Sequence, residues 1–125
     1  MTQTDNTLNP LPPGILPVGV ERKDASVVTD GVNPALMLFL TKLGLVSLHL
    51  FDLPVIVTSA KDGAHASGSK HYRGDAVDVR ISDKSPLDQS AFLLVLTTLA
   101  RQFKLAVFDE SNLPGASHVH IEIAG

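Results

Sequence analysis

The sequence predicts an α+β domain in which helices cover one face of a mostly antiparallel sheet. Two segments carry helix-start signals, because Asn33-Pro34 and Ser85-Pro86 each place a capping side chain before a first-turn proline. Four shorter segments are β-branched or alternate between apolar and polar side chains, as strands do, and they are residues 55–59, 75–81, 104–108 and 118–123. Elements of this kind pack as two layers around one core.

Length and composition indicate one globular domain and exclude several functions. The chain has 125 residues, of which 44% are hydrophobic and 18% charged, so a second domain has no room. It has no cysteine, which excludes disulfides and thiolate ligands. A net charge of -3 and a pI near 5.9 give no basic stripe for nucleic acid. We expect neither a membrane helix nor a secretory signal.

The first 20 residues are predicted to form an extended, proline-rich arm, and residues 21–125 the single domain. Four of the eight prolines lie in this arm among Thr, Asn and Gln. The arm is either a disordered leader or a segment whose apolar side chains lie against the domain or a neighbouring subunit. Those apolar residues are Leu8, Leu11, Ile15, Leu16 and Val18.

The first helix is expected to open at Pro34 and to run through Met37, Leu40 and Leu43. Gly44 either ends this helix or bends it before Leu50. His49 has no metal-like neighbours in the sequence, so we expect it to be solvated. The β-branched segment 55–59 then predicts a strand that leads into a turn at residues 62–63.

The second helix is marked by a capping box, since Ser85 is followed three residues later by Asp88. We expect it to run to about Phe103. Its predicted buried side consists of apolar residues at helical spacing, namely Leu87, Ala91, Leu94, Val95 and Leu99. The strand 104–108 follows and should deliver Asp109 and Glu110 to the rim of a cleft.

A zinc site is predicted from two alternating strands and the loop before the first of them. In residues 75–81 the valines and Ile81 share one face, which leaves Asp78 on the other. In residues 118–123 the same alternation places His120 away from the core. If the strands are neighbours, these two side chains line one cleft, and Gly74 lets the preceding loop bring His71 to it. Two imidazoles and a carboxylate suit one catalytic Zn²⁺ per chain, with the fourth position left to water.

The spacing of these residues also resembles that of a known family. The pattern SxHxxGxAxD is present as Ser69, His71, Gly74, Ala76 and Asp78, and a His-x-His strand follows far downstream. It is similar to the zinc D-alanyl-D-alanine carboxypeptidase and L-alanyl-D-glutamate endopeptidase family. Within that superfamily, which has the Hedgehog/DD-peptidase fold, the local likeness is strongest to the amino-terminal signalling domain of Hedgehog.

The Hedgehog likeness spans roughly residues 33 to 123 and rests on two motif segments. It includes the run HYxGxAVD and a Glu-Ser pair, Glu110-Ser111, ahead of the His-x-His. It also includes Thr58, Asp62-Gly63 and His65, which lie at the matching approach to the first ligand. Hedgehog uses an acidic calcium cluster as well, but only Asp62 has a counterpart here, so no calcium is expected.

The resemblance assigns roles to residues around the zinc. It makes His71, Asp78 and His120 the ligands, and Glu110 the catalytic base and acid, with Asp109 in reserve. His65 and His118 would either contact the substrate or orient a ligand. The alternative is that Glu110 is an exposed loop carboxylate without a catalytic role.

The chain departs from the bacterial members at two places. Those members often carry the catalytic acid three residues before the last ligand, where this chain has Ser117; Glu110 fits the Hedgehog-like position if residues 112–115 form an extra loop. They also carry a substrate-binding arginine near the position of Lys61, which lacks its bidentate fork.

Candidates for substrate contact are Ser69, Lys61 and Arg73, although Lys61 and Arg73 also fit ordinary surface charges. Glu122 shares the ligand face, and we expect it to form a cross-strand ion pair with Arg80.

The resemblance implies a zinc metallopeptidase that cleaves amide bonds in peptidoglycan stem peptides. With no signal peptide expected, such an enzyme would be made in the cytoplasm and reach the cell wall after lysis or on a phage particle. The alternative is a zinc-binding interaction module without turnover, since fold alone does not decide activity. A virion structural protein with a vestigial site is the third hypothesis.

Overall fold

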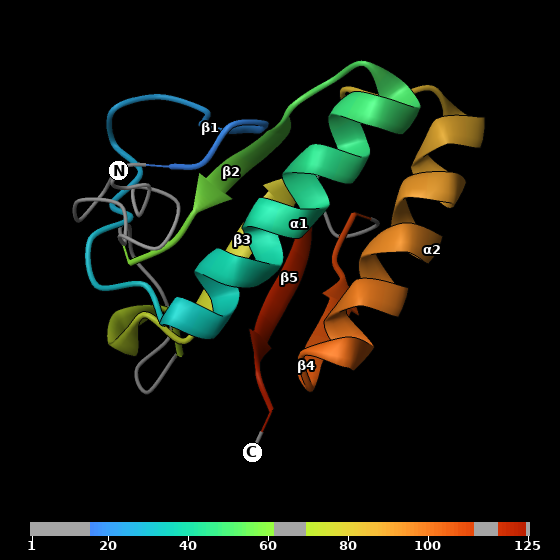
Figure 1. The fold of residues 1–125 in the computed structure, drawn as a ribbon. Coiled ribbons are helices and arrows are strands. Elements are labelled where there is room, and N and C mark those ends of the chain that lie inside the picture. Colours follow the sequence, from blue (N-terminus) through green and yellow to red (C-terminus); the bar gives the residue numbers. More distant parts are fainter. Residues whose placement is uncertain (1–15, 62–69, 112–117, 125) are drawn as a thin grey trace, which may run out of the picture.

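The computed structural model describes residues 16–61, 70–111 and 118–124 and shows two helices against a five-stranded mixed sheet (Figure 1). The elements in chain order are β1 (Val20–Arg22), α1 (Pro34–Phe51), β2 (Val55–Ser59), the 3-10 turn η2 (Lys70–Arg73), β3 (Ala76–Arg80), α2 (Pro86–Gln102), β4 (Leu105–Asp109) and β5 (His118–Ile123). The α+β class predicted from the sequence is confirmed.

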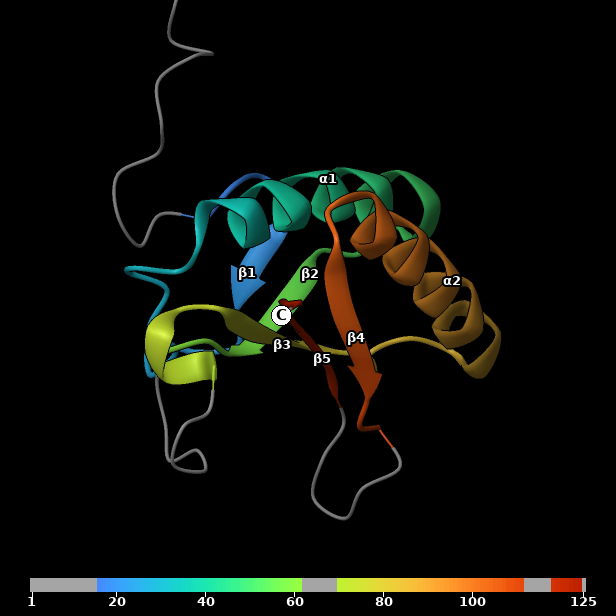
Figure 2. The ribbon, with the colours of Figure 1, turned by 90° about the horizontal axis from the view of Figure 1, so that it is seen from below.

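The sheet has the strand order β1-β2-β3-β5-β4, and all of its pairings are antiparallel except that of β1 with β2. Strand β1 has three residues, too few to show an alternating pattern, and it was not predicted. Both helices lie on the same side of the sheet (Figure 2). Neither α1 nor α2 therefore covers the opposite face of β3 and β5.

The core lies between the helices and the sheet. Its largest fully buried side chains come from both layers and include Leu36, Phe39, Leu40, Phe92, Leu96, Val77, Val79 and Ile121. Both predicted caps are present, since the Asn33 side chain accepts from the amide of Ala35 and Ser85 accepts from that of Asp88. Side-chain caps of this kind stabilise a helix by about 1 kcal/mol.

The predicted buried side of α2 is wrong in part. Leu87 and Leu94 are 80% and 68% exposed, and Ala91 is exposed as well. The buried stripe is Phe92, Leu96 and Ala100, with Val95 and Leu99 partly buried beside it. The segment is apolar on most of its circumference, so its periodicity did not determine which face meets the sheet.

Gly44 does not end α1, which continues to Phe51. It is buried where the helix crosses the chain entering β1. A Cβ on Gly44 would lie 2.8 Å from Cγ2 of Val20 and 2.9 Å from the carbonyl oxygen of Gly19. Glycine at this position therefore lets the helix approach the sheet closely.

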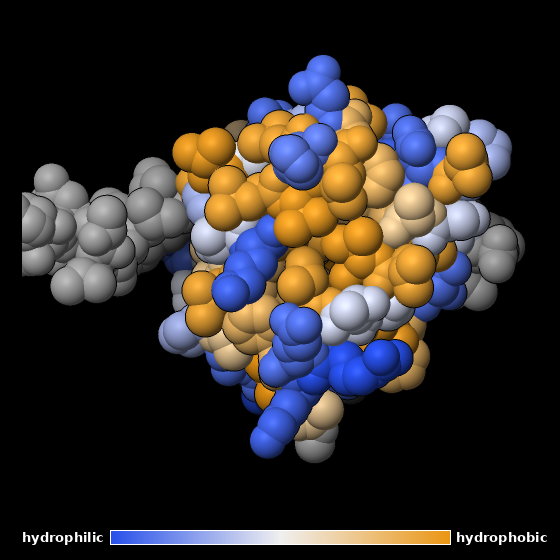
Figure 3. All heavy atoms as spheres, turned by 45° about the vertical axis from the view of Figure 1, so that its right-hand side comes forward, coloured by the Kyte–Doolittle hydropathy of each residue, from blue (hydrophilic) through white to orange (hydrophobic). Residues whose placement is uncertain are grey.

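Exposed leucines gather over the outer faces of the two helices, as Figure 3 shows. They are Leu38, Leu45 and Leu50 of α1 and Leu87 and Leu94 of α2. Among the described residues α1 is also the one helix whose length and composition would suffice to cross a membrane. One side of it packs in the core, because Leu36, Phe39 and Leu40 are completely or almost completely buried.

Replacement of Gly44 by alanine is expected to destabilise the fold. At an exposed helix position this change would stabilise the helix by up to about 1 kcal/mol, because alanine has the higher helix propensity. Here the methyl group must displace backbone and Val20, so we expect a net loss of about 1–3 kcal/mol in the free energy of unfolding. Urea denaturation measures it, with the exposed Lys42→Ala change in α1 as control. A gain in stability for Gly44→Ala would contradict the close approach.

Candidate metal centre

The register of β3 and β5 brings Asp78 and His120 together. The two strands are antiparallel neighbours, which meets the condition of the sequence prediction, and Asp78 lies directly opposite His120. The flanking valines of β3 face Ile121 and Val119 in the core. Because side chains alternate along a strand, Asp78 and His120 share the face of the sheet opposite α1 and α2.

His71 reaches the same point from η2. Strand β2 has an irregular register opposite β3, since Val57 pairs with Val79 but Ser59 pairs with Asp78. A bulge of this kind redirects a strand, and Ala60 follows it immediately. The carbonyl oxygen of Ala60 accepts a hydrogen bond from Nδ1 of His71 at 2.7 Å, which fixes the imidazole ring. His71 is 3% exposed.

The turn that carries His71 is anchored through Gly74 to the start of α1. The carbonyl of Gly74 accepts from the amide of Asn33 at 2.8 Å, and Nδ2 of Asn33 donates to Asp75. Gly74 has φ +77°, and a Cβ there would lie 2.1 Å from the carbonyl oxygen of Gly31. The sequence prediction that Gly74 turns the backbone is confirmed, and the close approach makes the glycine necessary.

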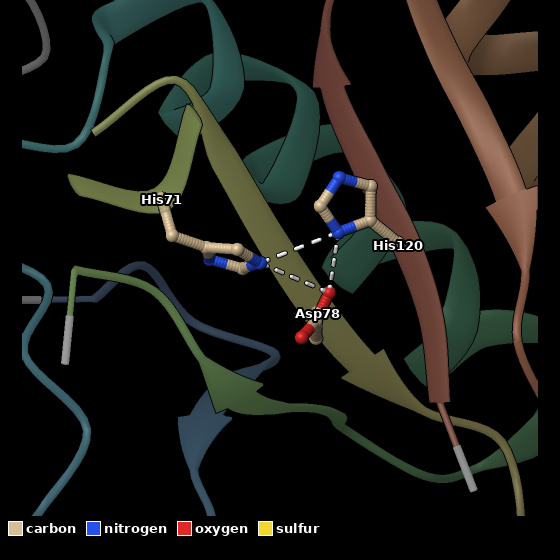
Figure 4. Close-up of side chains that lie close together, drawn as sticks. All are labelled: His71, Asp78 and His120. Carbon is tan, nitrogen blue, oxygen red and sulfur yellow. Dashed lines mark hydrogen bonds and ion pairs between the residues drawn. The ribbon is translucent and has the colours of Figure 1, made fainter. Parts of the chain in front are cut away.

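His71, Asp78 and His120 converge on one point, as predicted (Figure 4). Nε2 of His71 lies 3.3 Å from Nδ1 of His120 and 3.4 Å from Oδ1 of Asp78, and the last two atoms are 2.9 Å apart. Ligands about 2.05 Å from a tetrahedral ion are about 3.3 Å apart. Two sides of the triangle have this length, and the third is a hydrogen bond that a metal ion would replace. These residues form a group that could hold a metal ion.

Each histidine has a second partner that selects the nitrogen facing the cluster. Nδ1 of His71 donates to the carbonyl of Ala60, which leaves Nε2 as the nitrogen that faces the cluster and could coordinate a metal ion. Nε2 of His120 lies 2.8 Å from Oε1 of Glu122, so Nδ1 is the nitrogen that faces the cluster and could coordinate. Lys70 in turn forms an ion pair with Glu122 at 3.1 Å and donates to the carbonyl of Ile123. Such outer partners orient metal-binding histidines and raise their basicity.

The predicted ion pair between Glu122 and Arg80 is wrong. With Asp78 opposite His120, Arg80 lies opposite His118 and Glu122 opposite Ala76, at the other end of the pairing. The carboxylate therefore meets His120 and Lys70. Sequence reasoning missed this role, together with those of Lys70 and the Ala60 carbonyl. The register would have excluded Arg80, but only a structure reveals the carbonyl.

The electrostatics favour a charged, hydrogen-bonded cluster. Burial opposes ionisation of Asp78, but hydrogen bonds from His120 and His71 outweigh it and hold the pKa of Asp78 well below its usual range. Burial alone would lower the pKa of His120, yet its bonds to Asp78 and Glu122 raise it to about 9. Burial likewise opposes ionisation of Glu122, whose pKa is nevertheless lowered by His120 and Lys70. A bound metal ion would displace the Nδ1 proton of His120.

Glu110 and His118 form a second group beside the first. Nε2 of His118 lies 2.8 Å from Oε1 of Glu110 and 3.7 Å from Oδ2 of Asp78. Oxygens of Glu110 and Asp78 lie within 4.8 Å of each other, about the span that one water bridges by two hydrogen bonds. Asp78, Glu110 and His118 also form a group that could hold a metal ion. Glu110 comes from the end of β4, which begins and ends within one residue of the predicted strand.

The remaining predicted site residues make contacts outside the two donor groups or fall outside the described residues. Arg73 pairs with Asp75 at 3.4 Å, and its side chain is 61% exposed. The Lys61 side chain lies beside Gly31. Asp109 hydrogen-bonds to Ser111, and His49 is exposed on α1. The predictions for His65, Ser69, Ser117, the turn at 62–63, the loop at 112–115 and most of the arm fall on residues that the structure does not describe.

A scan against protein-family models and a search of curated proteins gave no match to this chain. Inferences about its chemistry therefore start from its own residues and their geometry. The main observation is that two imidazole nitrogens and one carboxylate oxygen converge from separate segments, η2, β3 and β5.

Replacement of Glu122 by glutamine is expected to weaken metal binding about 10-fold to 100-fold without removing any ligand. The neutral amide no longer favours an Nε2 proton on His120 as strongly, and Lys70 loses its ion pair. Calorimetric titration with Zn²⁺ measures the affinity. The exposed Glu21→Gln change in β1 is the matched control. Equal affinities for the two variants would show that Glu122 does not orient His120.

Proposed function

We propose that this domain is a zinc-dependent peptidase that hydrolyses amide bonds in peptidoglycan stem peptides, with the Hedgehog/DD-peptidase fold. The observation that carries the proposal is the triangle of Nε2 of His71, Nδ1 of His120 and Oδ1 of Asp78. Its dimensions suit a tetrahedral ion, and nitrogen with carboxylate oxygen is a donor set that zinc accepts well. Three protein ligands leave a fourth position for water, as in catalytic zinc sites.

A zinc ion held by these ligands would polarise the scissile carbonyl and lower the pKa of a coordinated water to about 7. The protein supplies the proton transfers. Glu110 lies close enough to Asp78 to share a water with it, so its carboxylate can take a proton from the attacking water. The same carboxylate then passes that proton to the departing amine. His118, hydrogen-bonded to Glu110, orients the carboxylate and can donate to the developing oxyanion.

The substrate class is inferred from the motif SxHxxGxAxD with its downstream His-x-His, which resembles peptidases of the bacterial cell wall. The structure supports an approach from one side. His71 and Asp78 are buried, whereas the side chains of Glu110 and His118 are partly exposed. A peptide would therefore meet the zinc from the edge formed by the end of β4 and the start of β5. We also propose that the enzyme acts on the cell wall after lysis or from a phage particle.

One observation favours the alternative of a zinc-binding module without turnover. The Glu110 carboxylate already accepts a hydrogen bond from His118, an arrangement that also stabilises a purely structural site. In that case the metal would add to folding stability while no bond is cleaved. The two functions differ in whether Glu110 matters for anything besides local stability.

The test is digestion of purified peptidoglycan by the zinc-loaded protein, with products identified by mass spectrometry. The wild type is expected to release peptide fragments. Glu110→Gln should lower the rate by about 100-fold or more, because it removes the proton acceptor and keeps the ligands. His71→Ala should abolish both activity and tight zinc binding, and His49→Ala, an exposed histidine, should change neither.

The outcomes separate the hypotheses. Full activity in Glu110→Gln would remove that residue from the mechanism. If the wild type binds zinc tightly but releases no peptide from peptidoglycan, the result would contradict the peptidase and favour the binding module.

A further inference from the structure

We propose that the domain holds a second divalent cation, bound by Oδ2 of Asp78, Glu110 and His118, so that the Asp78 carboxylate bridges two ions. The first site takes Oδ1 of Asp78, which faces His71 and His120 at 3.4 and 2.9 Å. The second oxygen is turned toward a different histidine, since Oδ2 lies 3.7 Å from Nε2 of His118. One carboxylate thus serves two sets of donor atoms.

The second set is complete enough to bind an ion. It contributes two carboxylates and one imidazole, whose ligand atoms all lie within 4.8 Å of one another. Oxygen with nitrogen donors suits Zn²⁺, Co²⁺ and Mn²⁺ alike. In known two-metal sites the ions lie about 3.5–4 Å apart, a separation that a shared carboxylate permits.

Charge and exposure make this second site the weaker one. The carboxylates of Asp78, Glu110 and Glu122 lie around the two sites and offset the charge of the cations. The side chains of Glu110 and His118 are 34% and 24% exposed, against 9% for Asp78, so water screens the second ion and competes with its ligands. A cation already at His71 and His120 would repel the second one.

Occupancy of the second site has a chemical consequence that rests on the proposed function. Glu110 is the proposed proton acceptor, and a carboxylate that coordinates a cation is a poor base. The peptidase is therefore expected to be active with one equivalent of zinc and to be inhibited as zinc rises further. Binding of the second ion itself does not depend on catalysis.

The test is calorimetric titration of the metal-free protein with Zn²⁺, repeated with Co²⁺ under electron paramagnetic resonance. The wild type is expected to bind one ion tightly and a second more weakly. Two cobalt ions that share a carboxylate couple magnetically, so the signal per bound ion should fall when the second ion enters. His118→Ala should lose only the weak event, and the exposed His49→Ala should keep both. Circular dichroism checks that each variant is folded.

Three results would overturn the second site: a single binding event in the wild type, a weak event that survives in both His118→Ala and Glu110→Gln, or two cobalt ions without coupling. These are distinct from failure of the proposed function. Two coupled ions in a protein that cleaves no peptide would support the second site and contradict the peptidase. Cleavage by a protein that binds one ion only, with no inhibition at high zinc, would do the reverse.

Discussion

The register between β3 and β5 is the constraint on which the candidate site depends. It places Asp78 opposite His120 on one face of the sheet and the valines of β3 opposite Val119 and Ile121 on the other. A slip by one residue would turn Asp78 into the core and a valine toward the solvent, at the cost of burying a carboxylate without partners. The same apolar contacts that form the core therefore also fix the geometry of the donors.

Much of this arrangement could be predicted from local sequence signals. The caps at Asn33 and Ser85 act within one turn, and the alternation around Asp78 and His120 reports directly which face each side chain takes. The buried face of α2 could not be predicted in the same way. Phe92, Leu96 and Ala100 recur at helical spacing just as Leu87 and Leu94 do, and only packing against the sheet decides between them.

The parts of the site that escaped prediction depend on tertiary contacts. The carbonyl of Ala60 carries no residue-specific signal, and it meets His71 because β2 changes register just before it. Lys70 occupies a variable position of the motif and looks like an ordinary surface charge in the sequence, yet it reaches Glu122 from 52 positions away in the chain. Asp78 belongs to both donor groups. Its buried carboxylate therefore connects the buried part of the site with the part that is partly exposed to solvent.

The three converging donors also affect how the domain unfolds. His71 and His120 are separated by 49 positions, and the chain contains no cysteine with which to staple such a span. An ion shared by these histidines would act as a reversible crosslink. Closing a loop of this length restricts the unfolded chain by about 4 kcal/mol in the simplest entropy treatment of crosslinks. Metal loading would thus tie the third strand of the sheet, its partner β5 and the preceding turn into one cooperative unit, a substitute for the disulfide that this small domain lacks.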